Sequence, residues 1–216
     1  IHESTTHCFA CGQKAGTWLF GEIANFTIIN NAIDSSKFVY MKDIAEKYKS
    51  DHKLSNKVII GHVGNLTEPK NHAYILDVFY ELQKMDKNFH LVLIGDGPLR
   101  KTIEIKIEKL MLNNHVSLLG IREDIPNLCQ MMDLFIFPSF YEGLPVTLIE
   151  AQASGLNILS SDTITKEVQI TDDIKFLSIN DSPKLWAQEA LSLYPYVREN
   201  NFKKIQKAGY DIKTNT

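Results

Sequence analysis

From residue 58 onward, short apolar runs alternate with segments of helical periodicity. The runs are rich in β-branched and aromatic residues, so each is typical of a buried strand. Strict alternation of strands and helices predicts an α/β fold: a Rossmann-like parallel sheet with helices on both faces. The expected strands are residues 58–63, 90–94, 116–119, 134–137, 157–160 and 175–177. One helix is expected after Asn71, and a second follows the strand at 90–94 and ends at about residue 112. Further helices are expected over 125–132, within 138–155 and over 183–193.

Two helix starts carry local signals. Asn71 is a residue type favoured at the N-cap, and it precedes a helical pattern containing Ile75 and Leu82. Ser182 is followed by Pro183, and proline is favoured at the first position of a helix. We therefore expect Asn71 and Ser182 to cap their helices.

The loops that follow the expected strands are the candidate functional loops. In parallel sheets with helices on both faces, ligands bind outside the carboxyl ends of the strands. Chemically informative residues follow four of the expected strands, at residues 64–70, 95–98, 120–122 and 138–145.

Composition limits the classes of function. The chain has 216 residues and a formal net charge of −3, which argues against nucleic acid as its main partner. No apolar run approaches the ~20 residues that span a bilayer, and we expect a cytoplasmic protein. Cys8 and Cys11 form a C-x-x-C that could be a redox pair or half a zinc site. The only other thiol is Cys129, so reduced, partly buried cysteines are the favoured interpretation.

The first part of the chain has a different pattern. Residues 6–11 and 26–29 are expected strands that flank a short helix over 14–20. Residues 35–57 are polar and charged, as in a linker with a surface helix. Because one β-α-β unit cannot form a domain, the chain is expected to be part of something larger.

The segment 138–155 places two carboxylates at the ends of an apolar stretch. Glu142 lies in a turn with glycine and proline, and Glu150 lies inside an expected buried helix. Acids are rarely buried without a partner. A carboxylate in such a helix therefore indicates a polyhydroxyl ligand.

The two glutamates are separated by seven residues, and this E-x7-E pattern resembles the signature of retaining glycosyltransferases of family four. That family has the GT-B fold of two facing Rossmann-like domains. The resemblance covers roughly residues 26–195. Within the family, the residues of these motifs are most similar to those of bacterial capsular or exopolysaccharide transferases. Further segments match the family in order: residues 30–34 (N-G-[VI]-D), 64–70 (G-R-x-x-x-x-K), 95–98 (G-x-G-P) and 119–122 (the L-G turn).

The resemblance implies roles for the charged residues. Glu150 would accept the ribose hydroxyls, and Glu142 would reach the hydroxyls of the donor sugar. Lys70 would pair with the diphosphate and stabilise the leaving group, so Glu142 and Lys70 are the candidate catalytic residues. The family's arginine position holds Asn65, which has no fixed charge, so Lys166 or Arg122 could supply a second cation.

Backbone groups complete the implied donor site. A helix N-terminus binds anions, so amides near the start of the helix in 138–155 would face the diphosphate and sugar. The turn after the third strand would hold the base. The full implied donor-binding set is Gly64, Asn65, Lys70, Gly95, Gly97, Gly120, Ile121, Arg122, Glu142, Gly143, Leu144, Val146 and Glu150.

The resemblance also implies how the chain is divided. Residues 1–27 would be the last β-α-β of an N-terminal acceptor domain, 28–57 a linker with a surface helix, 58–195 the donor domain and 196–216 a truncated helical tail. The expected substrate is a nucleotide sugar, most simply a UDP-sugar, with no cofactor and no metal. A saccharide or lipid-linked acceptor would bind through the N-terminal domain, which could also contact the membrane surface, so this chain alone would be nearly inactive.

Two other functions remain open at this point. A GT-B sugar-nucleotide epimerase would use a similar half-site, but its acid and base residues would differ from the E-x7-E pair. A non-catalytic nucleotide-binding module is compatible with Asn65 in place of arginine.

Overall fold

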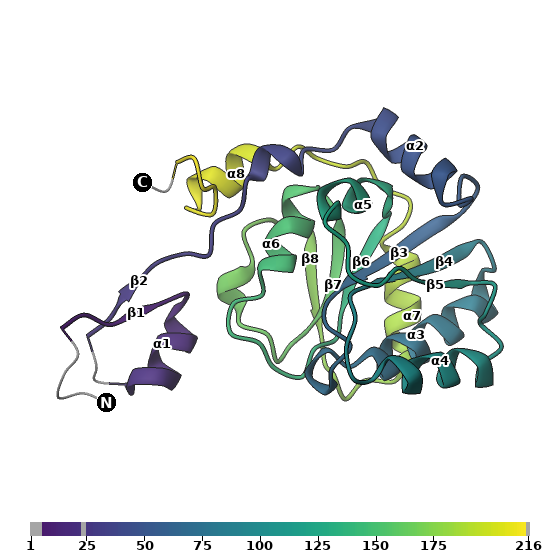
Figure 1. The fold of residues 1–216 in the computed structure, drawn as a ribbon, viewed down its shortest axis with the longest axis horizontal. Coiled ribbons are helices and arrows are strands. Elements are labelled where there is room, and N and C mark those ends of the chain that lie inside the picture. The colour runs from purple at the N-terminus through teal and green to yellow at the C-terminus, as the bar shows by residue number, and fades with distance from the viewer. Residues whose placement is uncertain (1–5, 23–24, 215–216) are drawn as a thin grey trace.

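The computed structural model describes residues 6–22 and 25–214, and its main body is a six-stranded parallel sheet (Figure 1). The strand order is β5-β4-β3-β6-β7-β8. The described part leaves out residues 1–5, 23 and 24 of the expected unit 1–27. It also leaves out residues 215–216 of the expected tail. The strands are β3 (Val58–Val63), β4 (Phe89–Ile94), β5 (Val116–Leu118), β6 (Leu134–Phe137), β7 (Asn157–Ser161) and β8 (Ile174–Leu177).

Helices cover both faces of this sheet, which confirms the expected Rossmann-like α/β class. Strands β3, β4 and β6 alternate their side chains between two apolar clusters, so Ile59 packs on one face and Ile60 on the other. Figure 1 shows the two helical layers on opposite sides of the sheet. One layer contains α2 (Lys42–Asp51), α5 (Ile125–Met131), α6 (Val146–Ala153) and α8 (Phe202–Lys207), and the other contains α3 (His72–Met85), α4 (Arg100–Lys109) and α7 (Pro183–Ser192).

Strand β3 is the point where the chain changes direction across the sheet. Ile60 pairs with Leu91 of β4 on one side and with Leu134 of β6 on the other. The chain adds β4 and β5 on one side of β3 and then returns to add β6, β7 and β8 on the other. Such a reversal opens a crevice at the carboxyl ends of the two central strands, and this is where ligands bind in open α/β sheets.

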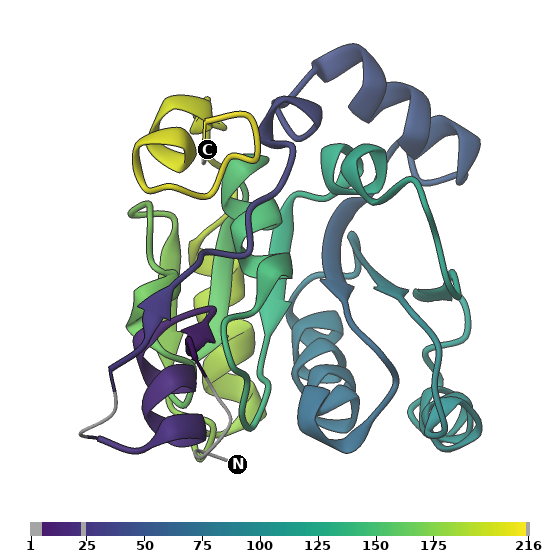
Figure 2. The ribbon, with the colours of Figure 1, turned by 60° about the vertical axis from the view of Figure 1, so that its left-hand side comes forward.

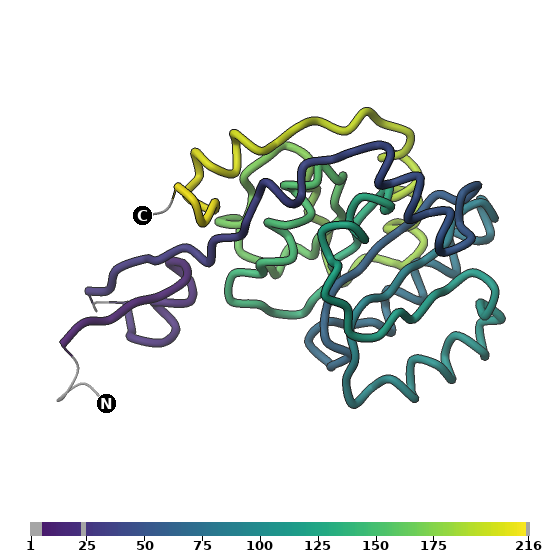
Figure 3. The backbone as a smooth tube through the Cα atoms, turned by 45° about the horizontal axis from the view of Figure 1, so that its top comes forward, coloured from purple at the N-terminus to yellow at the C-terminus, as the bar shows by residue number. Residues whose placement is uncertain are grey.

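A separate β-α-β unit precedes the sheet. Strands β1 (Phe9–Ala10) and β2 (Thr27–Ile28) pair in parallel and flank α1 (Gln13–Phe20), close to the positions expected from the sequence. Gly16 lets α1 pack on Phe26, since a Cβ at Gly16 would lie 2.2 Å from that ring. Figure 3 shows this unit projecting from the main body, joined to it by the segment after β2.

The segments expected as a linker and a tail pack against each other on the main body. Phe38 and Leu54 belong to the core, and α2 packs against α5. Ser35 donates its hydroxyl to the Asp211 carboxylate at 2.8 Å, and Ile33 forms a bridge with Asp211. Residues 28–57 and 196–214 are therefore parts of the packed structure rather than free connections.

One of the two expected caps is present. The Ser182 hydroxyl accepts the Leu185 amide at 3.3 Å, as expected. Asn71 precedes α3, but it has a φ of 54° and makes no side-chain cap. Its amide group instead donates to the Pro138 carbonyl at 3.2 Å, which ties the start of α3 to the loop after β6. The expectation for Asn71 was wrong because tertiary contacts use its side chain.

None of the described helices combines the length and apolarity that a membrane crossing requires. Cys8, Cys11 and Cys129 are free thiols, and Cys129 is buried.

Candidate functional site

The loops after β3, β4 and β5 meet at the carboxyl edge of the sheet. Gly95 donates its amide to the Gly120 carbonyl at 2.8 Å, and Leu66 donates to the Asp96 carbonyl at 3.0 Å. These bonds join three of the four loops that the sequence indicates. The fourth loop, after β6, is bonded to the β3 loop through Phe140 and Asn71.

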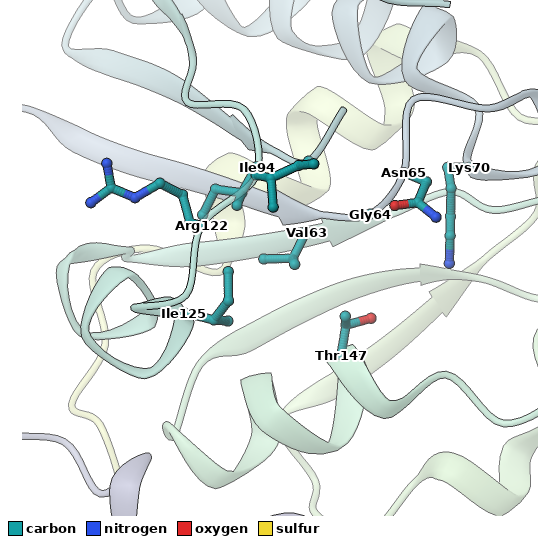
Figure 4. A pocket seen from close by; sticks show the side chains of 10 residues that line it. Val63, Gly64, Asn65, Lys70, Ile94, Arg122, Ile125 and Thr147 are labelled. Atoms are coloured by element: carbon teal, nitrogen blue, oxygen red, sulfur yellow. The ribbon is translucent and has the colours of Figure 1, made fainter. Parts of the chain in front are cut away.

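A pocket of about 350 Å³ opens between these loops and α6 (Figure 4). Six residues of the predicted donor-binding set line it, and four residues that sequence reasoning missed complete it. The predicted lining residues are Gly64, Asn65, Lys70, Gly95, Ile121 and Arg122, and the others are Val63, Ile94, Ile125 and Thr147.

The two ends of this pocket differ in polarity. In the view of Figure 4, Ile94 and Ile125 lie toward one end, where Arg122 is paired with Asp124, whereas Asn65 and Lys70 lie at the other. Thr147 projects from α6 between these ends. A molecule with a flat apolar part at one end and an anionic part at the other would match this gradient.

Lys70 is held in place by its surroundings. It is the last residue of a 3₁₀ turn, η3 (Glu68–Lys70), which precedes α3. Its ammonium group lies 2.5 Å from a carboxylate oxygen of Glu142 and 5.2 Å from the centre of the Phe137 ring. The amide of Phe140 donates to the Pro69 carbonyl at 2.8 Å, which fixes the Glu142 loop beside Lys70. The two candidate catalytic residues are therefore in direct contact.

Arg122 does not supply a second cation beside Lys70. Its guanidinium group donates two hydrogen bonds, at 2.7 and 2.8 Å, to the carboxylate of Asp124. These bonds raise the pKa of Arg122 and lower that of Asp124. Figure 4 places Arg122 at the end of the pocket opposite to Lys70. The other candidate cation, Lys166, lies in η4 (Lys166–Val168) and does not line this pocket.

The start of α6 presents polar groups to the pocket. Pro145 is the N-cap residue of α6. The first backbone amide that forms a hydrogen bond within the helix is that of Leu148, which donates to the Pro145 carbonyl at 3.1 Å. The first amides of a helix have no partner within it, so those of Val146 and Thr147 are open to a ligand. The Thr147 hydroxyl is buried and has no partner among the described residues. Thr147 was missed because a lone threonine after a proline has no distinctive spacing.

Glu150 lies one turn beyond Thr147 on the same face of α6. Burial raises the pKa of its carboxyl group to about 7, and no hydrogen bond or charge of the described residues offsets this effect. Burial and the nearby Glu150 charge raise the pKa of the Cys129 thiol to about 12. Glu150 is thus a largely buried acid with no partner among the described residues, in the apolar helix where the sequence placed it.

Glycines allow the loops to approach one another closely. Gly95 has a φ of 131°, and a Cβ there would lie 2.2 Å from the Gly64 carbonyl oxygen. A Cβ at Gly97 would lie 2.7 Å from the Leu66 carbonyl oxygen. The backbone amides of Gly64, Gly95 and Gly97 already donate hydrogen bonds within the protein. These glycines therefore shape the site and do not offer free donors.

The remaining predicted residues divide into two groups. Glu142 and Gly143 line a second cavity of about 660 Å³, whose other wall is α1 of the N-terminal unit. The others line neither cavity: Gly97 and Gly120 bond within the loops, Leu144 is buried, and Val146 and Glu150 belong to α6. Lys14, Ala15, Trp18, Leu19 and Tyr141 complete the lining of the second cavity.

Two buried histidines lie behind Lys70. The rings of His62 and His72 are T-shaped, with centroids 4.8 Å apart, and His62 contacts the Ile136 carbonyl through Nδ1 at 2.9 Å. Burial lowers both pKa values, that of His72 to about 4, and the charge of Lys70 lowers them further. Both imidazoles are therefore neutral near pH 7.

Within residues 6–22 and 25–214, no group of three or more His, Cys, Asp or Glu side chains is arranged to hold a metal ion.

The fold defines the chain as a Rossmann-like α/β protein with a pocket at the switch point of its sheet. The sequence profile of the group 1 glycosyl transferases matches residues 43–195. The chain therefore belongs to the group 1 glycosyltransferases, a family of GT-B enzymes.

Individual relatives agree with this assignment. The chain is 36% identical to the glycosyltransferase EpsF of Bacillus subtilis over 100% of its own length and 58% of EpsF. It is 29% identical, over 67% of its length and 38% of the relative, to the Escherichia coli UDP-Gal:alpha-D-GlcNAc-diphosphoundecaprenol alpha-1,3-galactosyltransferase. The chain thus spans less than two thirds of the relatives that it matches.

A solved structure has the same fold. The structure of HepE from Anabaena in complex with UDP-glucose superposes with a TM-score of 0.81 at 18% identity. The match covers 97% of this chain and 61% of HepE.

Proposed function

We propose that this chain is the donor-binding half of a retaining glycosyltransferase that uses a UDP-sugar in bacterial polysaccharide synthesis. The polarity of the main pocket carries this proposal. Its apolar end suits a base and its cationic end suits a diphosphate, while the unpartnered Glu150 lies on the helix that lines it. The names of the relatives support UDP-sugars as the donor class.

Each part of the donor has a matching group. The base would lie against Ile121 and Ile125, and the diphosphate would lie between Lys70 and the open amides of α6. Thr147 would donate its unpartnered hydroxyl to the same phosphates. The carboxylate of Glu150 would accept both ribose hydroxyls, because its two oxygens match a vicinal diol.

Lys70 and Glu142 would act on the reacting part of the donor. In the chain without ligand, Glu142 neutralises Lys70. A bound diphosphate would share the lysine cation, and this would release Glu142 to accept hydrogen bonds from the sugar hydroxyls. As the bond from the sugar to the diphosphate breaks, Lys70 and the α6 amides would stabilise the negative charge on the leaving group.

Retention would follow from the direction of attack. The acceptor hydroxyl would approach the sugar on the face from which the diphosphate leaves, and it would give its proton to the departing diphosphate as the new bond to the sugar forms. The acceptor would bind on the side of the N-terminal unit, residues 6–28, and we propose that this unit belongs to an acceptor domain. A lipid-linked saccharide is the acceptor class that the name of the E. coli relative suggests. Such an acceptor would bring the whole protein to the cytoplasmic face of the membrane.

Calorimetry with UDP, UMP and uridine tests the donor site. We expect UDP to bind more tightly than UMP, since Lys70 would hold the second phosphate, and we expect Glu150→Ala to weaken UDP binding by at least about tenfold. Glu189→Ala is the control, because Glu189 pairs with Lys175 at 2.5 Å on the surface of α7, away from the pocket. Failure of UDP, GDP and ADP all to bind, or equal affinity in Glu150→Ala, would contradict the proposal.

Transfer assays distinguish the enzyme from the other two functions. A full-length protein that contains this chain would transfer a labelled sugar from UDP and release UDP. An epimerase would interconvert the UDP-sugar without an acceptor, and a binding module would do neither.

A further inference from the structure

The N-terminal unit is attached to the sheet body through the carboxylate of Glu167. One oxygen of this carboxylate accepts the amide of Gln13 at 2.7 Å, and the other accepts the amide of Lys14 at 3.1 Å. Glu167 is 153 and 154 positions away from these residues, so the contact joins distant parts of the chain. Figure 2 shows the start of the chain lying beside the part of the body that contains this segment.

This contact acts as the N-terminal cap of α1. The first amides of a helix need a partner from outside, and the N-cap residue of α1 is Gly12, which has no side chain to offer. A negative group is also favoured at this end by the helix dipole. Gly12 leaves room for Glu167, since a Cβ there would lie 3.0 Å from the carboxylate oxygen.

Glu167 is itself held firmly by the sheet body. The Thr165 hydroxyl donates to its carboxylate at 2.9 Å, and the next residue, Val168, is fully buried. Gln152 of α6 donates to the Val168 carbonyl at 2.8 Å. Burial alone would raise the pKa of Glu167, but the hydrogen bonds from Gln13, Lys14 and Thr165, together with the charge of Lys14, outweigh this effect and keep the pKa below its ordinary value.

The position of α1 determines one wall of the cavity that contains Glu142. Lys14, Trp18 and Leu19 face Tyr141 and Glu142 across about 660 Å³. The ammonium group of Lys14 adds a second polar connection, to the Thr163 carbonyl at 3.2 Å. If α1 moved away, the cavity beside Glu142 would lose this wall.

We propose that Glu167 is a positioning residue for the transfer reaction. Its carboxylate caps α1 across the boundary between the N-terminal unit and the donor body, and so holds α1 over the Glu142 loop. The consequence for transfer rests on the proposed function, whereas the cap itself does not.

Amide hydrogen exchange, measured by NMR on the 216-residue chain, tests the cap directly. In Glu167→Ala, the amides of Gln13 and Lys14 should exchange about tenfold faster or more. Glu167→Gln should give an intermediate rate, because the amide side chain keeps one acceptor oxygen and loses the charge. The amide of Val92 in the central sheet should be unchanged, and Glu189→Gln should match the wild type at all three positions.

Kinetics of the full-length protein test the positioning role. Glu167→Ala should lower kcat about tenfold and leave the KM for the donor unchanged, because the donor pocket does not include α1. Unchanged exchange at Gln13 and Lys14 would overturn the cap, and unchanged kcat with faster exchange would overturn the positioning role. If the wild type transfers no sugar, the proposed function fails, but the exchange rates still decide the cap.

Discussion

Lys70 and Glu142 form a salt bridge of 2.5 Å although they are 72 positions apart, and only 19% and 15% of their side chains are exposed. The pair joins the loop after β3 to the loop after β6, on the two strands that flank the switch point. The cation of Lys70 is thus neutralised by Glu142. A diphosphate bound as proposed would compete with Glu142 for Lys70.

Removal of the charge of Glu142 should therefore affect binding and transfer in opposite directions. Glu142→Gln leaves Lys70 free for the diphosphate, so affinity for UDP should rise about two- to tenfold. Transfer by the full-length protein should fall by about 100-fold, since the sugar loses a carboxylate acceptor. Calorimetry and a transfer assay measure the two effects. Weaker UDP binding in Glu142→Gln would show that the pair does not compete with the ligand.

Lys70→Met provides the complementary change. The methionine chain preserves the packing over Phe137 but has no charge. Affinity for UDP should fall about tenfold or more and become less sensitive to salt, whereas affinity for uridine should stay the same. Titration of both ligands at low and high salt measures this. Lys101→Met, on the outer surface of α4, is the matched control, and an equal loss with that variant would refute the assignment.

Binding of UDP should depend on pH through Glu150. Its pKa is about 7 in the empty site, and only the carboxylate can accept both ribose hydroxyls. Affinity should therefore rise between pH 6 and 8, by about tenfold at most per pH unit. Calorimetry across this range is the measurement. The dependence should disappear in Glu150→Gln, and a curve of the same shape in that variant would assign the titration to another group.

The same residue should lower stability at higher pH. The unfolded chain releases the Glu150 proton near the ordinary value of 4.5, whereas the folded chain retains it up to about pH 7. The free energy of unfolding therefore falls between these two pH values. Glu150→Gln should be more stable than the wild type by about 2–3 kcal/mol at pH 8, with little advantage at pH 4. Urea unfolding at both pH values checks this, and an advantage that does not grow with pH would contradict it.

The histidine pair should lower the stability of the fold at low pH, whereas Glu150 lowers it at high pH. The unfolded chain binds a proton at His72 near pH 6.5, whereas burial lowers the pKa in the folded chain to about 4. Stability is thus lost as the pH falls from 6.5 to 4. In His72→Phe this loss should be smaller by about 2 kcal/mol, because the new ring fills a similar space and both imidazole nitrogens lack partners. Urea unfolding at pH 7 and pH 4.5 should show this difference, and equal losses would exclude His72 as the cause.

Two glycines in the predicted site should respond differently to alanine. Gly95→Ala should lower the free energy of unfolding by about 2 kcal/mol or more, since its φ is positive and the Cβ would meet a backbone oxygen. Gly143→Ala should change it by less than about 0.5 kcal/mol, since nothing lies within 4 Å of that position. Urea unfolding of Gly95→Ala, Gly143→Ala and the wild type measures these differences in the free energy of unfolding. Similar losses for both variants would contradict the role given to the loop packing around Gly95.

Local sequence was sufficient where one residue's neighbours along the chain decide its environment. The apolar runs of β3 and β4 predicted buried strands because a central parallel strand is covered on both faces. Ser182 and Pro183 predicted a helix start because capping involves only the next three residues. Glu150 was identified as a buried acid because its helical neighbours are apolar.

Local sequence was insufficient where distant segments compete for one group. Asn71 is a residue type that is favoured at N-caps, but its side-chain amide donates a hydrogen bond to the Pro138 carbonyl of another loop. Thr147 enters the pocket only because the sheet brings α6 opposite β3 and β4.

The sequence alone therefore determined the alternating elements, the loops at the sheet edge and the two acids, Glu142 and Glu150, at the ends of an apolar segment. Only the tertiary structure decided that Lys70 pairs with Glu142, and that Glu167 caps α1. Periodicity and spacing encode which face of an element is buried, and this depends on residues a few positions apart. Ion pairs and caps between residues 70 and 142, or 13 and 167, depend on how whole elements pack, so no local pattern specifies them.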